Sequence, residues 1–210
     1  WRDTSAAKLL GDDPAALDRA LAGARIAYFS GISVAILSDR GRANLRGALA
    51  RARTQGTMVV FDPNLRPSVW PAVATMRDPL NDLARHADWV LPGIAEGQLL
   101  TGQTTPADIA AWYLDRGAKA VVIKQGAEGA YFRTASGEQG QVPGLPVPVV
   151  VDTVGAGDAF AVGVISAQLE GLAWPQALRR ANWIASRALQ VVGDMEGLPT
   201  RAELIAQNLE

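Results

Sequence analysis

The sequence predicts an α/β protein with a mostly parallel central sheet, flanking helices and an antiparallel edge. Short apolar runs alternate with longer amphipathic stretches through residues 25–124, which is typical of βαβ units. The next runs are shorter and separated by Gly and Pro, which favours antiparallel strands. Helical patterns then continue to the C-terminus. Because there is no internal repeat or long linker, residues 1–210 are expected to form one α/β domain.

The parallel part of the sheet is predicted from four apolar runs, each followed by a helical pattern. The runs that read as buried strands are 25–30, 57–62, 88–92 and 120–124. The helical patterns lie near 40–55, 72–86, 94–101 and 106–116. This alternation predicts that the carboxyl ends of the four strands meet at one edge.

The antiparallel edge and the C-terminal helices follow. Residues 129–134, 139–144 and 146–151 read as three short strands, the last of them buried. Two helices are predicted at 155–170 and 174–190, the first with a core stripe that includes Phe160 and Val164. A final helix begins at Thr200, with Glu203 in the capping-box position.

Composition excludes several classes of function. The formal net charge is −1 and no basic run is present, so no nucleic-acid partner is expected. There are no cysteines and one histidine, which excludes disulfides, thiolate nucleophiles and histidine-rich metal sites. No apolar run reaches membrane-spanning length, so no membrane partner is expected. The absence of cysteine fits a cytoplasmic protein.

Ligands of open α/β sheets bind beyond the carboxyl ends of the strands, which makes a shortlist of the segments found there. These segments are 30–31, 62–66, 93–96, 124–129 and 152–158. Each is polar or glycine-rich, and the last reads DTVGAGD. The shortlist predicts a single ligand-binding edge.

The GAGD tetrapeptide has two interpretations. Small residues at a helix N-terminus let an anion approach unpaired backbone N–H groups, and Asp158 in the first turn could act as a base. The commoner meaning is a glycine turn capped by a carboxylate. A Walker A loop is absent, and GxGxxG matches only at Gly155 and Gly157, with no acidic residue about 20 positions later. A nicotinamide-binding Rossmann module is therefore only weakly supported.

The longer stretch DTVGAGDAFAVG closely resembles the C-terminal signature of the ribokinase-like (PfkB) carbohydrate kinases. The resemblance implies that Asp158 is the catalytic base and that Gly155, Ala156 and Gly157 form an anion hole for the transferred phosphoryl group. Further stretches resemble the 2-keto-3-deoxygluconate kinase branch of this family: FDPNLRPSVW, VLPGIAEGQLLTG, VVIKQGAEGAY and GDMEGLPTRAEL. The resemblance covers essentially the whole chain.

The resemblance also implies a ribokinase-like fold whose N-terminal strands and lid are largely absent. Trp1 opens the chain without an initiator Met, and WRDTSAAKLL resembles an internal segment of the family. We therefore expect the family's N-terminal part to precede Trp1. That part carries some of the family's sugar contacts, and the lid often builds dimers, so a homo-oligomer stays open.

Nucleotide binding is assigned through the resemblance to Lys124, Gly126, Gly129 and Asn182, which would line the ATP site. A K-x-G-x-x-G turn alone is usually just a loop. The alternative for Asn182 is a solvated asparagine on a helix. These four positions are expected to contact ATP.

Through the resemblance, sugar-acid binding is assigned to Arg2, Arg66 and Asp194. An arginine fork matches a carboxylate or phosphate bidentately. The alternatives are a surface arginine on a Pro-bracketed turn for Arg66, a loose terminus for Arg2 and a loop-capping carboxylate for Asp194.

A magnesium role is assigned to Glu96, which matches the glutamate of the family's N-x-x-E motif and would act largely through water. Here the motif reads GIAE, so Gly93 replaces the asparagine. Mg²⁺ keeps several waters and needs few carboxylates, so this loss is tolerable. A monovalent-cation site near DTVGAGD is also left open.

The function expected from the sequence is ATP- and Mg²⁺-dependent phosphorylation of a sugar acid, with 2-keto-3-deoxygluconate giving its 6-phosphate. The alternatives are another PfkB kinase of the ribokinase or fructokinase type, a nicotinamide-binding module, and a fragment that binds nucleotide without catalysis. The epimer of the sugar acid is left open.

Overall fold

The computed structural model describes residues 5–70 and 72–210, and the side chain of residue 73 is not described. The chain forms two compact units. Unit 1 contains residues 1–122 and 133–137, and unit 2 contains residues 123–132 and 138–210. The division between units falls within strands β4 and β5. The single domain expected from the sequence stays a prediction.

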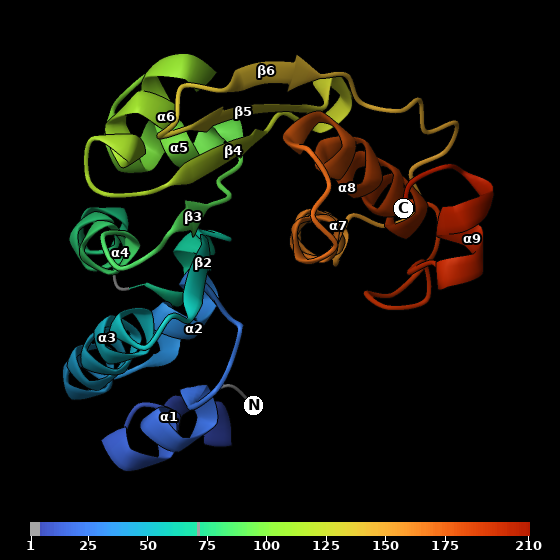
Figure 1. Ribbon diagram of the computed structural model, residues 1–210. Helices are drawn as coiled ribbons and strands as arrows, with labels where there is room; N and C mark the ends of the chain where they lie inside the picture. The colour runs from blue at the N-terminus through green and yellow to red at the C-terminus, as the bar shows by residue number, and fades with distance from the viewer. Residues whose placement is uncertain (1–4, 71) are drawn as a thin grey trace. The chain divides into compact units, whose positions relative to one another are not determined.

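The strands follow one another in the sheet in chain order, from β1 to β6. Figure 1 labels β2 to β6. They are β1 (Ile26–Ser30), β2 (Met58–Asp62), β3 (Trp89–Val90), β4 (Ala120–Lys124), β5 (Ala130–Thr134) and β6 (Gln139–Val142). The first four form a parallel ladder, in which Phe61 pairs with Phe29 and with Val90. Five- and four-residue connections join β4 to β5 and β5 to β6, so these neighbours run antiparallel. The predicted mixed α/β fold is confirmed.

The helices of unit 1 lie between its parallel strands, except α1, which precedes β1. They are α1 (Pro14–Leu21), α2 (Gly31–Ile36), α3 (Asp39–Thr54), α4 (Arg77–Ala84), α5 (Ile94–Thr101) and α6 (Pro106–Leu114), with short 3-10 turns at Ala6–Leu9, Pro67–Val69 and Val73–Thr75. In α3 the buried side chains Leu45, Ala48, Leu49 and Ala52 recur at helical spacing, which sets the face that packs inward. Phe29 and Phe61 stack on neighbouring strands with ring centroids 4.7 Å apart.

Unit 2 contains the 3-10 turn Gly126–Glu128 and the helices α7 (Ala156–Leu169), α8 (Trp174–Ala188) and α9 (Arg201–Ala206). Helices α7 and α8 pack so closely that a β-carbon at Gly163 would collide with the backbone of Ala181. The capping box of α9 forms as predicted: the backbone N–H of Thr200 donates to Glu203 Oε2 over 2.8 Å.

One predicted element is wrong. Residues 146–151 form no strand, and Val149, Val150 and Val151 are exposed rather than buried, with Val149 at 65%. Prolines at 146 and 148 have no N–H to donate, so this segment lacks regular ladder hydrogen bonds. Its end is held instead by the N–H of Val151, which donates to Leu189 O over 2.8 Å. The alternating apolar pattern therefore produced an extended loop.

Two helices were not predicted, α1 and α2 (Gly31–Ile36). Helix α1 begins at Pro14, and the side chain of Asp13 accepts the N–H of Ala15 over 2.9 Å. The Asp-Pro pair is a recognisable start signal, with the cap followed by proline at the first helical position. Among the described residues, no helix has the length and apolar character needed to cross a membrane.

Candidate active site

The GAGD segment forms the start of helix α7. Gly155 is the N-cap, with φ 76°, a left-handed conformation that favours glycine. A β-carbon there would also lie 2.7 Å from Asp194 Cα. Both the backbone angle and the lack of space therefore favour glycine at this position. Ala156, Gly157 and Asp158 form the first turn, where backbone N–H groups have no partner within the helix. The segment has the local geometry of an anion site.

Lys124 lies next to this helix start. Its Nζ would be 3.7 Å from a β-carbon built at Gly157. Lys124 ends strand β4, so the ammonium group is carried by the sheet rather than by a loop. A cation beside a helix N-terminus makes a strong local field for an anion.

A cavity of about 590 Å³ in unit 2 opens at this point. Six of the predicted site residues line it: Lys124, Gly126, Gly129, Ala156, Gly157 and Asn182. Asp158 is exposed and is not one of the lining residues. Apolar side chains supply much of the remaining wall, among them Leu145, Val147, Val150 and Leu189. One end of the cavity is therefore charged and polar, and the rest suits an apolar ring.

Gly126 and Gly129, which follow β4, are glycine for different structural reasons. Gly126 has φ 60° and open space around its Cα, so its need is conformational. Gly129 has φ 91°, and a β-carbon there would also collide with the backbone of residues 142–144. The K-x-G-x-x-G turn thus packs against the loop after β6.

Asn182 is buried rather than solvated, with 8% of its surface exposed. Its Nδ2 donates to Pro143 O over 3.0 Å and to Val142 O over 3.4 Å. The side chain therefore holds the loop after β6 against helix α8, where both border the cavity. The alternative of a solvated helix asparagine is wrong.

Asp152 orders the GAGD loop, a role that sequence reasoning did not assign to it. Its Oδ1 accepts the N–H of Val154 over 3.0 Å, and its Oδ2 accepts the N–H of Gly193 over 3.4 Å. These bonds, led by the one from Val154, lower the pKa of Asp152. The carboxylate therefore connects the loop before α7 to the exposed loop that carries Asp194. An aspartate whose side chain accepts the backbone N–H two residues later forms an Asx turn, and Asp in a glycine-rich loop is a recognisable signal for such a turn.

In unit 1, Arg66 is exposed and its Nη1 donates to the neighbouring Leu65 O over 3.1 Å. It follows the β2 strand end, as expected from the sequence. Arg2 lies outside the described residues.

Glu96 is the third residue of helix α5, and both of its carboxylate oxygens are engaged. Oε2 accepts the N–H of Gly93 over 2.7 Å, and Oε1 accepts the N–H of Leu65 over 2.8 Å. The second bond reaches the loop after β2, 31 residues earlier in the chain. Burial and then the charge of Glu96 raise the pKa of Tyr113, whose hydroxyl has no hydrogen-bond partner among the described residues.

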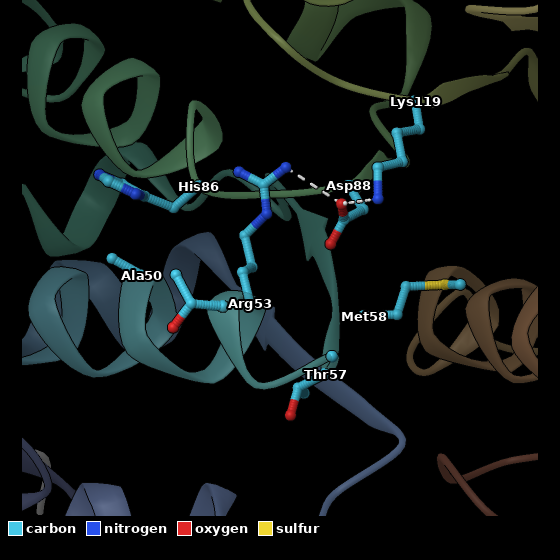
Figure 2. Close-up of a pocket in the computed structure, with 9 residues that line it drawn as sticks. Ala50, Arg53, Thr57, Met58, His86, Asp88 and Lys119 are labelled. Atoms are coloured by element: carbon cyan, nitrogen blue, oxygen red, sulfur yellow. Dashed lines mark hydrogen bonds and ion pairs between the residues drawn. The ribbon is translucent and has the colours of Figure 1, made fainter.

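The opposite end of the same strands carries a second charged cluster, around a cavity of about 440 Å³ (Figure 2). Asp88 lies between Arg53 and Lys119, with both nitrogen–oxygen distances 3.0 Å. Its other oxygen accepts the N–H of Val59 over 2.9 Å. His86 also lines this cavity, and burial lowers its pKa despite the opposing charge of Asp82. Arg53 and Lys119 are therefore both ion-paired with the buried carboxylate of Asp88.

Comparison with known proteins identifies the family. Residues 3–201 match the family described as pfkB family carbohydrate kinase. The chain therefore belongs to the pfkB family of carbohydrate kinases.

Individual relatives narrow the similarity. Over 152 residues the chain is 57% identical to the 2-dehydro-3-deoxygluconokinase of Bacillus subtilis (strain 168), covering 72% of this chain and 47% of that protein. It is similar to the crystal structure of a PfkB protein from Polaromonas sp. JS666, with a TM-score of 0.77, 48% identity, and coverage of 90% of this chain and 59% of that one.

A third similarity is to an E. coli protein assigned as a ribokinase II, solved in complex with ATP and Mg²⁺. The TM-score is 0.79 at 30% identity, and the match covers 90% of this chain and 60% of that chain. The chain thus spans about half to two thirds of the length of the relatives it matches.

Proposed function

We propose that the protein is an ATP-dependent kinase acting on a hydroxyl of a sugar acid, with 2-keto-3-deoxygluconate converted to its 6-phosphate. The observation that carries the proposal is the cavity of unit 2, where the Lys124 ammonium stands beside the start of α7 and Asp158 lies in the same helical turn. The similarity to 2-dehydro-3-deoxygluconokinase supports the choice of sugar acid.

The cavity fits ATP in size and in chemistry. Ligand pockets commonly have volumes of about 300–1,000 Å³ and are mostly apolar with a few placed polar groups. Here the apolar wall around Leu145, Val147 and Leu189 suits the adenine ring. The charged end, with Lys124 and the α7 start, suits the phosphates. Gly126, Gly129 and Asn182 shape the loops between the two ends.

In the proposed reaction, Asp158 accepts the proton of the substrate hydroxyl as that oxygen attacks the γ-phosphorus of ATP, and the bond from this phosphorus to the bridging oxygen breaks to release ADP. Bound ATP supplies the γ-phosphoryl group, and Mg²⁺ offsets part of its negative charge. The backbone N–H groups of Gly155, Ala156 and Gly157, together with the Lys124 ammonium, stabilise the charge on the phosphoryl oxygens. These groups are fixed before reaction by the helix and the strand that carry them.

The residues also fit a magnesium ion held through water. Among the described residues, no three His, Asp or Glu side chains gather to hold a metal. Glu96 gives one lone pair of each oxygen to a backbone N–H, and a carboxylate has about four such sites, so it can still accept metal-bound waters. We assign Glu96 this role, and a monovalent cation near the loop at residues 152–155 is a further proposal.

Sugar-acid contacts are assigned within each unit. Arg66 in unit 1 offers an exposed guanidinium for the carboxylate of the substrate. In unit 2, Asp194 is exposed and adjoins Gly155, where it would accept hydrogen bonds from sugar hydroxyls. Arg2 is assigned the same substrate on its motif position alone.

Asp158→Asn in the complete gene product tests the proposal. We expect turnover to fall by about 10²- to 10⁴-fold, because an amide cannot take the proton, while ATP affinity measured by calorimetry stays within a few-fold. Asp39→Asn is the matched control: Asp39 is also an acidic first-turn residue, and its side chain is 99% exposed. Turnover that survives in Asp158→Asn would end the assignment of the base.

A substrate panel tests the sugar. We expect 2-keto-3-deoxygluconate and its galactonate epimer to be phosphorylated far better than ribose or fructose. A preference for ribose or fructose would instead indicate a different sugar kinase of the family. Tight binding of a nicotinamide nucleotide in place of ATP would contradict the kinase proposal itself.

The proposed partners are therefore ATP and a small sugar acid, in the cytoplasm where ATP is abundant. A net charge of −1 gives no support to a nucleic-acid partner.

A further inference from the structure

The carboxylate of Glu96 joins two segments that both follow strand ends in unit 1. One is the start of helix α5 and the other is the segment Pro63–Pro67 after β2, which carries Arg66. The bond to Leu65 N spans 2.8 Å and the bond to Gly93 N spans 2.7 Å. Hydrogen bonds from N–H groups to an ionised carboxylate are roughly twice as strong as neutral ones. Glu96 is therefore a structural connection as well as a negative charge.

The segment Pro63–Pro67 depends on such side-chain acceptors. Because both of its ends are proline, its only backbone N–H groups belong to residues 64, 65 and 66. Two of these are bound by carboxylates: Asn64 N donates to Asp62 Oδ1 over 3.2 Å, and Leu65 N donates to Glu96. Asn64 has φ 33°, a conformation that an isolated chain rarely holds. The segment thus keeps its shape through contacts that originate outside it.

Gly93 suits this arrangement for a reason other than backbone freedom. Its φ of −70° and ψ of 156° are open to any residue. A β-carbon at this position, however, would lie 3.2 Å from Glu96 Oε2, closer than such atoms normally approach. Glycine therefore lets the carboxylate close onto the Gly93 N–H while its other oxygen reaches Leu65.

We propose that Glu96 is the positioning residue for Arg66, holding the sugar-acid-binding loop through the Leu65 N–H, and that Gly93 makes room for this contact. The inference rests on the proposed function for its kinetic consequence, because Arg66 is there assigned to the substrate carboxylate. Its structural part, the order of the Leu65 backbone, does not depend on any activity.

The main test uses Glu96→Gln and follows the Leu65 amide by hydrogen exchange. In a glutamine side chain an NH₂ donor replaces one of the two carboxylate oxygens, so one of the two N–H groups loses its acceptor. We expect the Leu65 amide to exchange about 10- to 100-fold faster than in the unsubstituted protein, as expected for losing one charge-assisted hydrogen bond. Exchange within twofold of the original rate would overturn the proposal.

Kinetics then separate this role from a metal role. If Glu96 positions Arg66, the KM for the sugar acid rises about 10-fold or more in Glu96→Gln, in addition to any loss of kcat. If the sugar-acid KM is unchanged and only kcat or the Mg²⁺ requirement changes, Glu96 acts at the metal alone and the positioning role is refuted. If the unsubstituted protein phosphorylates no sugar acid, the proposed function fails, and the Leu65 exchange rates still decide the structural part.

Two further variants test whether faster exchange at Leu65 comes from the loss of this contact or from a general loss of stability. Gly93→Ala keeps the charge of Glu96 but crowds Oε2, so we expect faster Leu65 exchange, by about 2- to 10-fold. Glu203→Gln is the matched control, because Glu203 occupies the same third position of helix α9 and also accepts the N-cap N–H. It should leave Leu65 exchange unchanged, and a similar acceleration there would indicate general loosening and contradict the proposal.

Discussion

Asp88 and Glu96 are carboxylates at opposite ends of the same parallel strands, and they are held by different kinds of partner. Asp88 precedes β3, is 4% exposed, and is paired with both Arg53 and Lys119 (Figure 2). Glu96 follows β3, is only partly buried, and accepts two backbone N–H groups. Among the described residues, no ion pair forms with Glu96.

The difference shows that one residue type can be held by cations at one end of the strands and by backbone N–H groups at the other. A carboxylate matched by two cations has little charge left for a ligand, whereas one held by neutral N–H groups keeps its charge. The end that holds Asp88 is thus closed by ion pairs, and the end that holds Glu96 is the one to which we assign the magnesium role.

The largest effect expected from this comparison is on stability. Asp88→Ala should lower the free energy of unfolding by about 3 kcal/mol, because it leaves the Val59 N–H and the Arg53 guanidinium without their buried partner. Denaturant unfolding measures the change. Glu96→Gln, measured in the same way, should cost about 1 kcal/mol. Equal losses of unfolding free energy in the two variants would contradict the difference inferred between Asp88 and Glu96.

A second, smaller effect appears in acid. Burial by itself would raise the pKa of Asp88, but the Val59 N–H, Lys119 and Arg53 together lower it. The unfolded chain then binds the proton first, so the stabilisation is complete above about pH 4 and is lost as the pH falls through the folded-state pKa. The stability difference between the protein and Asp88→Asn should therefore shrink below about pH 4. A difference that stays constant from pH 6 to pH 3 would contradict this reasoning.

The smallest effect separates the two cations around Asp88. Lys119 is 71% exposed, so Lys119→Ala should cost at most about 1 kcal/mol, as is typical of solvent-exposed pairs. Arg53 is 27% exposed and also donates to Arg85 O, so Arg53→Ala should cost more, about 2 kcal/mol. Thermal unfolding of both variants ranks them, and the reverse order would show that Lys119 is the main partner.

Local patterns predicted most of the elements, and their failures have identifiable causes. The strand at 120–124 and the helix at 94–101 match the structure residue for residue, because each has a strong apolar pattern with clear ends. The segment at 146–151 has an apolar pattern too, but its prolines and its exposed valines make it a loop. Periodicity alone cannot tell whether a partner strand will be present.

Candidate site residues divide in the same way. The sequence motif identified Lys124, Gly157 and Asn182, and the structure brings all three to one cavity. The motif did not reveal that Asn182 holds the loop at residues 142–143, or that Asp152 connects two loops 41 residues apart. Such partners are set by distances through space, for which spacing in the sequence carries little information.

By itself, the sequence determined most of the strands and helices, the glycines of the α7 start and the family to which the chain belongs. These depend on local chemistry: periodic burial, caps, turns and a contiguous motif. Only the tertiary structure decided which carboxylate would be neutralised and which would keep its charge. Asp88 and Glu96 differ in their partners because strand β3 places them at opposite ends, where Arg53 and Lys119 approach one and Leu65 approaches the other.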